Sequence, residues 1–214
     1  MRAFLEGADS SPQASLDTPT YFDFNDGHGL VLAHRHKNPD GSTGGWVANS
    51  AVVSSSAYVG VDAWVFGNAR IEGFAKVHGF AKVYGDARIR DSAQIFGHAK
   101  VFWKADVSGY AKVFGDAEVH GNAKVFGHAK VFGDTEVRGN AEIFGIAEIS
   151  GSAMVYDNAK IGGKAEIHGY AEVYGDAKIG GNALVSDIAK VGGNAEVGGY
   201  TRITTGTTLS GLHE

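Results

Sequence analysis

Aliphatic residues recur at every sixth position along most of the chain. From Val47 to Leu209 each position in steps of six is Val, Ile or Leu, which makes 28 consecutive matches without an insertion. The fourth residue after each of the first 27 is Ala or, three times, Thr. Side chains alternate between the two faces of a strand, so these two positions point to the same side. The pattern predicts short strands that share one continuous aliphatic and alanine core.

The residues between these strands predict sharp corners. Of the 23 positions from 67 to 199 in steps of six, 19 are Gly, and the exceptions are Asp91, Trp103, Asp157 and Asp187. The next position is often Asn or Asp, and these residues, like Gly, tolerate the positive φ of tight turns. One strand and one corner per six residues give a triangular coil of 18, so residues 47–208 form about nine coils. We predict an all-β, three-sided parallel β-solenoid.

The first 46 residues lie outside the repeat. Residues 1–20 are polar and punctuated by Ser and Pro, which predicts a flexible N-terminal arm. Residues 21–24 and 30–36, with a Gly-rich turn between them, have the pattern of a β-hairpin, and residues 38–42 that of a turn. An uncovered solenoid end invites edge-to-edge association. We therefore expect residues 21–46 to form a hairpin cap and residues 47–214 to form the β-helix.

Composition narrows the class of protein. The hydrophobic content of 43% is too high for a disordered chain despite 32 Gly residues. There is no Cys for disulfides or thiolate metal sites, which fits a reducing compartment. The segment Met1–Gly7 lacks the apolar core of a signal peptide, and no stretch approaches the ~20 apolar residues of a membrane span. With a net charge of −5, we expect a cytoplasmic protein that binds neither membranes nor nucleic acid.

An aliphatic residue, three variable residues, a small residue and a variable residue form a repeat that resembles the hexapeptide-repeat family. This resemblance covers about three quarters of the chain and implies a left-handed, single-stranded parallel β-helix. The segments Gly44–Val47 (GGWV) and Ala63–Arg70 (AWVFGNAR) further resemble a group of bacterial and prophage-encoded solenoid proteins. Those proteins are often labelled as acyltransferases or given no function, so the resemblance leaves the activity open and allows a phage-encoded origin.

The resemblance implies acyl transfer or carbonic anhydrase chemistry as enzymatic alternatives. Hexapeptide-repeat acyltransferases are trimers in which an interface His acts as general base, usually beside a protruding loop. The carbonic anhydrases need two His separated by four residues, and no such pair occurs. The outward histidines share their positions with Phe, Tyr and Asp, and no loop interrupts the repeat, which favours a surface column. The candidate general bases are His78, His98, His120, His128 and His168.

Two further groups of histidine and aromatic residues are candidates for binding. His28, His34 and His36 could hold a metal if the last two point the same way from one strand, although a solvated strand face is the favoured explanation. Residues 18 apart stack on one face, so the outward aromatic residues form columns, which act either as stiffening ladders or as contact faces. The candidate contact residues are Phe66, Tyr84, Phe102, Phe96, Phe114, Phe132 and Trp103, the last of which replaces a corner Gly.

Charge also varies along the repeat. The position before each aliphatic is largely basic up to Lys130 and turns acidic from Glu136, which could favour pairing between two rods. We favour a non-enzymatic structural or interaction scaffold without a cofactor. It would form a homodimer or homotrimer, or bind a protein partner, through its aromatic columns. The alternative is an acyl-CoA-dependent acyltransferase of the hexapeptide-repeat family with an interface His.

Overall fold

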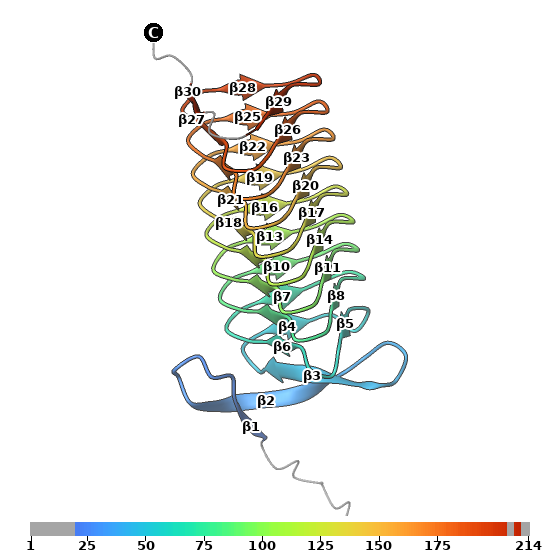
Figure 1. Ribbon diagram of the computed structural model, residues 1–214. Helices are drawn as coiled ribbons and strands as arrows, with labels where there is room; N and C mark the ends of the chain where they lie inside the picture. The colour runs from blue at the N-terminus through green and yellow to red at the C-terminus, as the bar shows by residue number, and fades with distance from the viewer. Residues whose placement is uncertain (1–19, 205–207, 211–214) are drawn as a thin grey trace, which may run out of the picture.

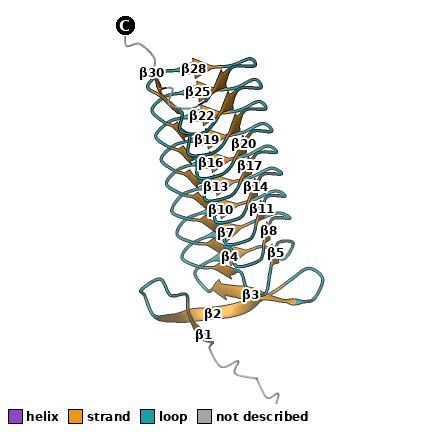
Figure 2. Ribbon diagram, viewed as in Figure 1, coloured by secondary structure: helices purple, strands orange, loops and turns teal. Residues whose placement is uncertain are grey.

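The computed structural model describes residues 20–204 and 208–210, which form strands and turns wound into a three-sided parallel β-solenoid of about nine turns (Figures 1 and 2). Within the coils, consecutive strands belong to different sheets, and every third strand returns to the same sheet one coil further on, whereas the first three strands share one sheet. The predicted all-β solenoid is confirmed, and the arrangement is consistent with the expected left-handed winding. In the described ranges no helix is long and apolar enough to cross a membrane.

The first sheet has twelve strands and contains the N-terminal hairpin. Its order is β1 (Tyr21–Asp23), β2 (Leu30–Lys37), β3 (Thr43–Ala48), β6 (Trp64–Val65), β9 (Lys82–Val83), β12 (Lys100–Val101), β15 (Glu118–Val119), β18 (Glu136–Val137), β21 (Met154–Val155), β24 (Glu172–Val173), β27 (Lys190–Gly192) and β30 (Thr208–Ser210). The β1–β2 and β2–β3 pairs are antiparallel, and from β3 onward the pairing is parallel.

The other two sheets are parallel and have nine strands each. The second sheet contains β4 (Val52–Val53), β7 (Arg70–Ile71), β10 (Arg88–Ile89), β13 (Asp106–Val107), β16 (Lys124–Val125), β19 (Glu142–Ile143), β22 (Lys160–Ile161), β25 (Lys178–Ile179) and β28 (Glu196–Val197). The third sheet contains β5 (Tyr58–Val59), β8 (Lys76–Val77), β11 (Gln94–Ile95), β14 (Lys112–Val113), β17 (Lys130–Val131), β20 (Glu148–Ile149), β23 (Glu166–Ile167), β26 (Leu184–Val185) and β29 (Arg202–Ile203).

The core follows the six-residue period. Val125 and Ile143 are neighbours in the second sheet and are fully buried, as the repeat predicts. The Ala side chains four residues after each aliphatic lie in the same core. The inward aliphatic column loosens near its two ends, where Val53 is only half-buried and Leu209 is exposed. Stacking of coils therefore buries these residues, and an end coil has a neighbour on one side alone.

Each corner turns at one left-handed residue. All 23 predicted corner positions have a positive φ, including the four without Gly. At Gly115 a Cβ would lie 2.9 Å from the backbone nitrogen of Gly133 in the next coil. The corner position therefore disfavours a side chain for two reasons, its positive φ and the close approach of the next coil. Asp91 compensates with a side chain that accepts a hydrogen bond from the backbone N–H of Gly109 at 2.9 Å. The Asn or Asp that follows the corner residue has no positive φ, so its role is different.

The N-terminal hairpin lies across the first coil (Figure 1). The side-chain amide of Asn38 accepts from the N–H of Val59 at 2.9 Å and donates to its carbonyl at 3.1 Å. Asn38 thus satisfies the outer edge of β5, which starts the third sheet. Strand β3 pairs with both β2 and β6, so the hairpin and the coils share one sheet across residue 46. The expected arm at residues 1–20 lies outside the described residues except for Thr20.

Candidate functional site

The aromatic columns form stacked ladders along the corners. The ring centroids of Phe96, Phe114 and Phe132 lie 4.7 and 4.8 Å apart, and the ring planes are parallel to within 2°. Tyr84 stacks on Phe102 in the same way at 4.9 Å. These rings are half-buried, and each except Phe132, which is followed in its column by Ser150, has a ring on both faces. The rings therefore stack as a ladder, and mainly their edges face outward.

Phe66 is not available as a contact residue. Only 5% of its surface is exposed, because Phe24 of the hairpin stacks on one face of the ring at 4.8 Å and Tyr84 covers the other face at 4.8 Å. The repeat could not show this, since Phe24 lies outside it. The column that starts at Phe66 is consequently continuous with the core of the hairpin.

The five candidate general bases do not converge on one site. They occupy two positions of the repeat and are spread over all three corners. Three of them stack on an aromatic ring one coil earlier: His98 on Phe80, His120 on Phe102 and His128 on Tyr110. His78 instead stacks beneath Phe96, where burial and the charge of Lys76 lower its pKa. His168 is half-buried in the same column as His78. Four of the five histidines therefore take the place of a ring in a ladder, whereas His168 lies between Ser150 and Ser186 in its column.

His120 has the most specific surroundings of the five. Its Nε2 lies 2.9 Å from Oε1 of Glu136, which also pairs with Arg138 at 3.1 Å, and its Nδ1 is buried without a partner. Trp103 packs edge-on against its ring at 5.2 Å. A general base needs a ring nitrogen within reach of substrate. Neither nitrogen of His120 is open in this way, so the cluster holds the corner together instead.

The three N-terminal histidines do not share a metal site. The pairing of β2 with β3 shifts register between Arg35 and Lys37, and the two strand histidines differ in burial. His36 is buried with Nε2 3.1 Å from the carbonyl oxygen of Ala57, whereas Nδ1 of exposed His34 lies 2.9 Å from the side-chain oxygen of Asn49. His28 pairs with Asp26 at 3.3 Å. Among the described residues no group of three potential ligands could hold a metal ion.

Exposed apolar side chains gather at two of the three corners. They occupy the position after the left-handed residue, four positions into the repeat. Phe74, Tyr110, Ile146 and Tyr200 lie at the corner between the second and third sheets, and Phe80, Tyr170 and Ile188 at the corner between the third and first sheets. These residues were missed as candidates, although stepping by 18 from Phe74 and Phe80 reveals the columns. Together they border both sides of the third sheet.

The remaining corner, between the first and second sheets, is polar at the same position. Asn122, Asn140, Asn158 and Asp176 form a ladder in which each amide donates to the side-chain oxygen one coil on, at 2.9–3.1 Å. This hydrogen bonding is the role of the Asn and Asp residues that follow the corner residue at this corner. The solenoid therefore has one wholly polar corner and two at which exposed apolar side chains alternate with polar ones, so its three faces are not equivalent.

The outward charges of the third sheet form an ordered column. Lys112, Lys130, Glu148 and Glu166 are in register on successive coils. Lys130 and Glu148 pair at 2.6 Å, whereas Lys112 and Glu166 make no ion pair within the described residues. Two unpaired and opposite charges thus flank a paired centre at equal distances along the axis.

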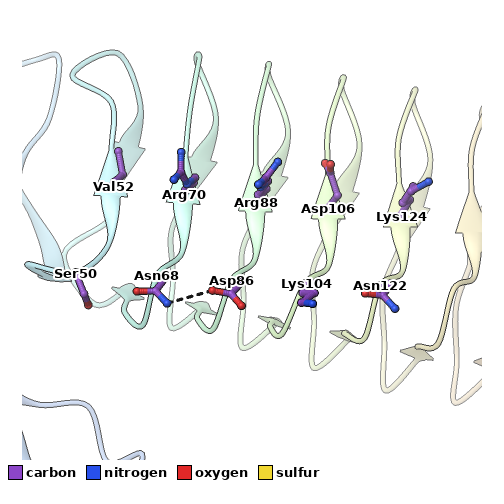
Figure 3. A pocket seen from close by; sticks show the side chains of 10 residues that line it. All are labelled: Ser50, Val52, Asn68, Arg70, Asp86, Arg88, Lys104, Asp106, Asn122 and Lys124. Carbon is purple, nitrogen blue, oxygen red and sulfur yellow. Dashed lines mark hydrogen bonds between the residues drawn. The ribbon is translucent and has the colours of Figure 1, made fainter.

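A basic trough of about 690 Å³ lies on the second sheet beside the polar corner (Figure 3). Its two walls are a row of strand side chains and a row of corner side chains. The strand row is Val52, Arg70, Arg88, Asp106 and Lys124, and the corner row is Ser50, Asn68, Asp86, Lys104 and Asn122. A smaller hollow of about 350 Å³ adjoins it and shares Asp86, Lys104 and Asn122 with it, and the exposed ring of Trp103 lines this hollow.

Comparisons with known proteins do not name a family for this chain. No family and no curated protein matches it in sequence. Among solved structures it is similar to the UDP-N-acetylglucosamine acyltransferase from Campylobacter jejuni, with 23% identity and a TM-score of 0.37. The match covers 73% of this chain and 66% of that protein, so the chain spans less than two thirds of its length. This similarity is too low to indicate a shared activity, and the class of the protein follows from its own structure: a parallel β-solenoid of hexapeptide repeats.

Proposed function

We propose that this chain is a non-enzymatic scaffold that pairs with a second copy of itself, antiparallel, through its third sheet. The observation that carries the proposal is the charge column of that sheet, in which Lys112 and Glu166 are left unpaired on either side of the Lys130–Glu148 pair. A two-fold axis between Lys130 and Glu148 places each Lys112 opposite the partner's Glu166. Because the contact is isologous, it forms this Lys112–Glu166 pair twice, once in each direction between the two copies.

The borders of the third sheet supply the apolar part of this contact. Tyr110 and Ile146 on one side, and Phe80 and Tyr170 on the other, are each at least 46% exposed. Large exposed apolar groups in two rows mark an association surface. An aromatic side chain buries ~150–250 Å² when covered, so a few of them supply most of the ~800 Å² per partner of a standard interface. At the ends of the column the pairing places Lys76 opposite the partner's Arg202, where solvent screens their repulsion.

The proposal refines the aromatic-column hypothesis. The ladder of Phe96, Phe114 and Phe132 lies at the third–first corner and belongs to the proposed contact, whereas Tyr84, Phe102 and Trp103 lie at the polar corner and do not. A rigid prism with one associating face suits a spacer or an assembly unit. The acyltransferase alternative would need a histidine facing a substrate groove, and no observation at the five histidines favours it.

Charge reversal tests the pairing in sedimentation velocity. The parent should sediment as a dimer. Lys112→Glu places two carboxylates opposite each other at two points of the interface, so this variant should sediment largely as a monomer. Adding Glu166→Lys restores opposite charges and should restore the dimer. Lys104→Glu changes the same charge at the polar corner and should leave the dimer intact. A parent that sediments as a monomer, or thiol release from acetyl-CoA that depends on one of the five histidines, would contradict the scaffold.

A further inference from the structure

We infer that the trough on the second sheet is a binding site for a ring-bearing diphosphate, of the nucleoside diphosphate class. The phosphate groups would lie between Arg70, Arg88 and Lys104, and the ring would stack on Trp103. This site lies on a different face from the proposed dimer contact, so it does not depend on that proposal.

The first observation is a stack of two unpaired arginines. Arg70 and Arg88 are in register on adjacent coils, ~4.8 Å apart, and both are exposed. Like charges directly opposite in a sheet destabilise it. Elsewhere on the same sheet Lys124 and Lys160 both pair with Glu142, and Lys178 pairs with Glu196. In the described part of the chain neither arginine has a carboxylate partner, so their repulsion is left for a bound anion to relieve.

The second observation is that the strand acid of the trough is already paired. Asp106 is the register neighbour of Arg88, but both of its oxygens accept hydrogen bonds from Arg90, at 3.0 and 2.7 Å. Asp86 in the corner row accepts a hydrogen bond from the neutral amide of Asn68 at 3.1 Å and keeps its negative charge. Lys104 approaches from the corner row without an ion pair of its own among the described residues (Figure 3). Two guanidinium groups and one ammonium group therefore surround the trough, and adjacent oxyanions fit the forked donors of stacked arginines.

The third observation is the conformation of Trp103. It has a φ of 56° in a slot that is Gly at 19 of the 23 corners, and its ring is 60% exposed. A bulky residue in the left-handed region is rare and carries strain that the surrounding structure must offset. Its ring packs edge-on against Phe102 and His120, which leaves a face over the hollow next to Lys104. An exposed indole face beside a cationic trough is a platform for a flat ring.

Isothermal titration calorimetry with ADP and with inorganic pyrophosphate tests the site. Both should saturate the parent protein, with ADP tighter because its base adds the stacking on Trp103. The double substitution Arg70→Gln and Arg88→Gln should weaken both probes by about tenfold or more. Its matched control is Lys160→Gln with Lys178→Gln, which removes the same charge from the same sheet outside the trough and should change neither affinity by more than about twofold.

A second variant separates the two halves of the ligand. Trp103→Gly installs the usual residue of that slot, so the fold should tolerate it, and it should abolish the advantage of ADP while leaving pyrophosphate binding unchanged. If neither probe saturates the parent, or if the control loses as much affinity as the arginine variant, the site is overturned. If pyrophosphate binds but ADP binds no tighter, the ring-bearing class is overturned. The dimer is read separately by sedimentation, so either proposal can fail alone.

Discussion

Val125 shows how a single position of the repeat determines which side chains lie in the core. It is fully buried between the coils, and the adjacent residue Lys124 points to solvent and pairs with Glu142 at 3.3 Å. Val125→Asp would place a carboxylate in the core without a partner, so we expect the free energy of unfolding to fall by several kcal/mol. Val52→Asp is the matched control, because Val52 is 51% exposed. Thermal melts followed by circular dichroism that agree within about two degrees for both variants would contradict the inward assignment.

The corner slot combines an unusual φ with a close approach, and three glycines separate these effects. Gly115 has a φ of 72° and a neighbouring backbone nitrogen 2.9 Å from an added Cβ, so Gly115→Ala should cost more than the ~1–2 kcal/mol of the left-handed conformation alone. Gly199 has a φ of 63° but nothing within 4 Å, and Gly180 has neither constraint. The three alanine variants should therefore melt in the order Gly115, Gly199, Gly180, from lowest to highest. Equal melting temperatures would show that the corners are not restricted.

At the scale of the elements, the stacked rings join coils that share only two-residue strands. Phe114 lies between Phe96 and Phe132, with ring centroids 4.7 and 4.8 Å away. Phe114→Ala removes both stacks and should lower the free energy of unfolding by ~1–3 kcal/mol in denaturant titrations. Phe74→Ala removes an equally large ring that is 71% exposed and should have little effect. A similar loss in both variants would mean that the columns do not stiffen the solenoid.

The sequence repeat predicts the strands and corners well because the same residue types determine the same local structure in every six residues. Inward aliphatics, small residues at the bends and left-handed corners each follow from one position in six, and stacking multiplies them along the axis. The different surroundings of His34 and His36, and the cover that Phe24 provides over Phe66, depend on single contacts outside the repeat. The site also depends on charge partners, since only the structure shows that Asp106 bonds to Arg90 and leaves Arg88 unpaired.

For the whole molecule, the three faces of the prism have different roles in this account. The first sheet continues into the hairpin, the second carries the basic trough, and the third lies between two apolar corners. Because every coil has the same rise, two copies that pair antiparallel remain in register along the full contact. The charge change along the axis, from Lys112 and Lys130 to Glu148 and Glu166, is what makes the antiparallel alignment better than the parallel one. A parallel pair would bring each of these charges against its own copy.

Cysteine cross-linking tests the antiparallel contact most directly, because the chain has no Cys of its own. Two sheets that pack face to face lie ~10 Å apart, too far for a direct disulfide, so the thiols are joined with a bismaleimide of about that span. Lys112 and Glu166 are three coils apart, ~14 Å, beyond the reach of this reagent within one chain. With Lys112→Cys and Glu166→Cys together, the bismaleimide should yield a covalent dimer on a denaturing gel, whereas Lys112→Cys alone should yield none. Efficient cross-linking of the Lys112→Cys single variant would show a parallel pair, and no cross-link in either variant would show that the third sheet is not the contact face.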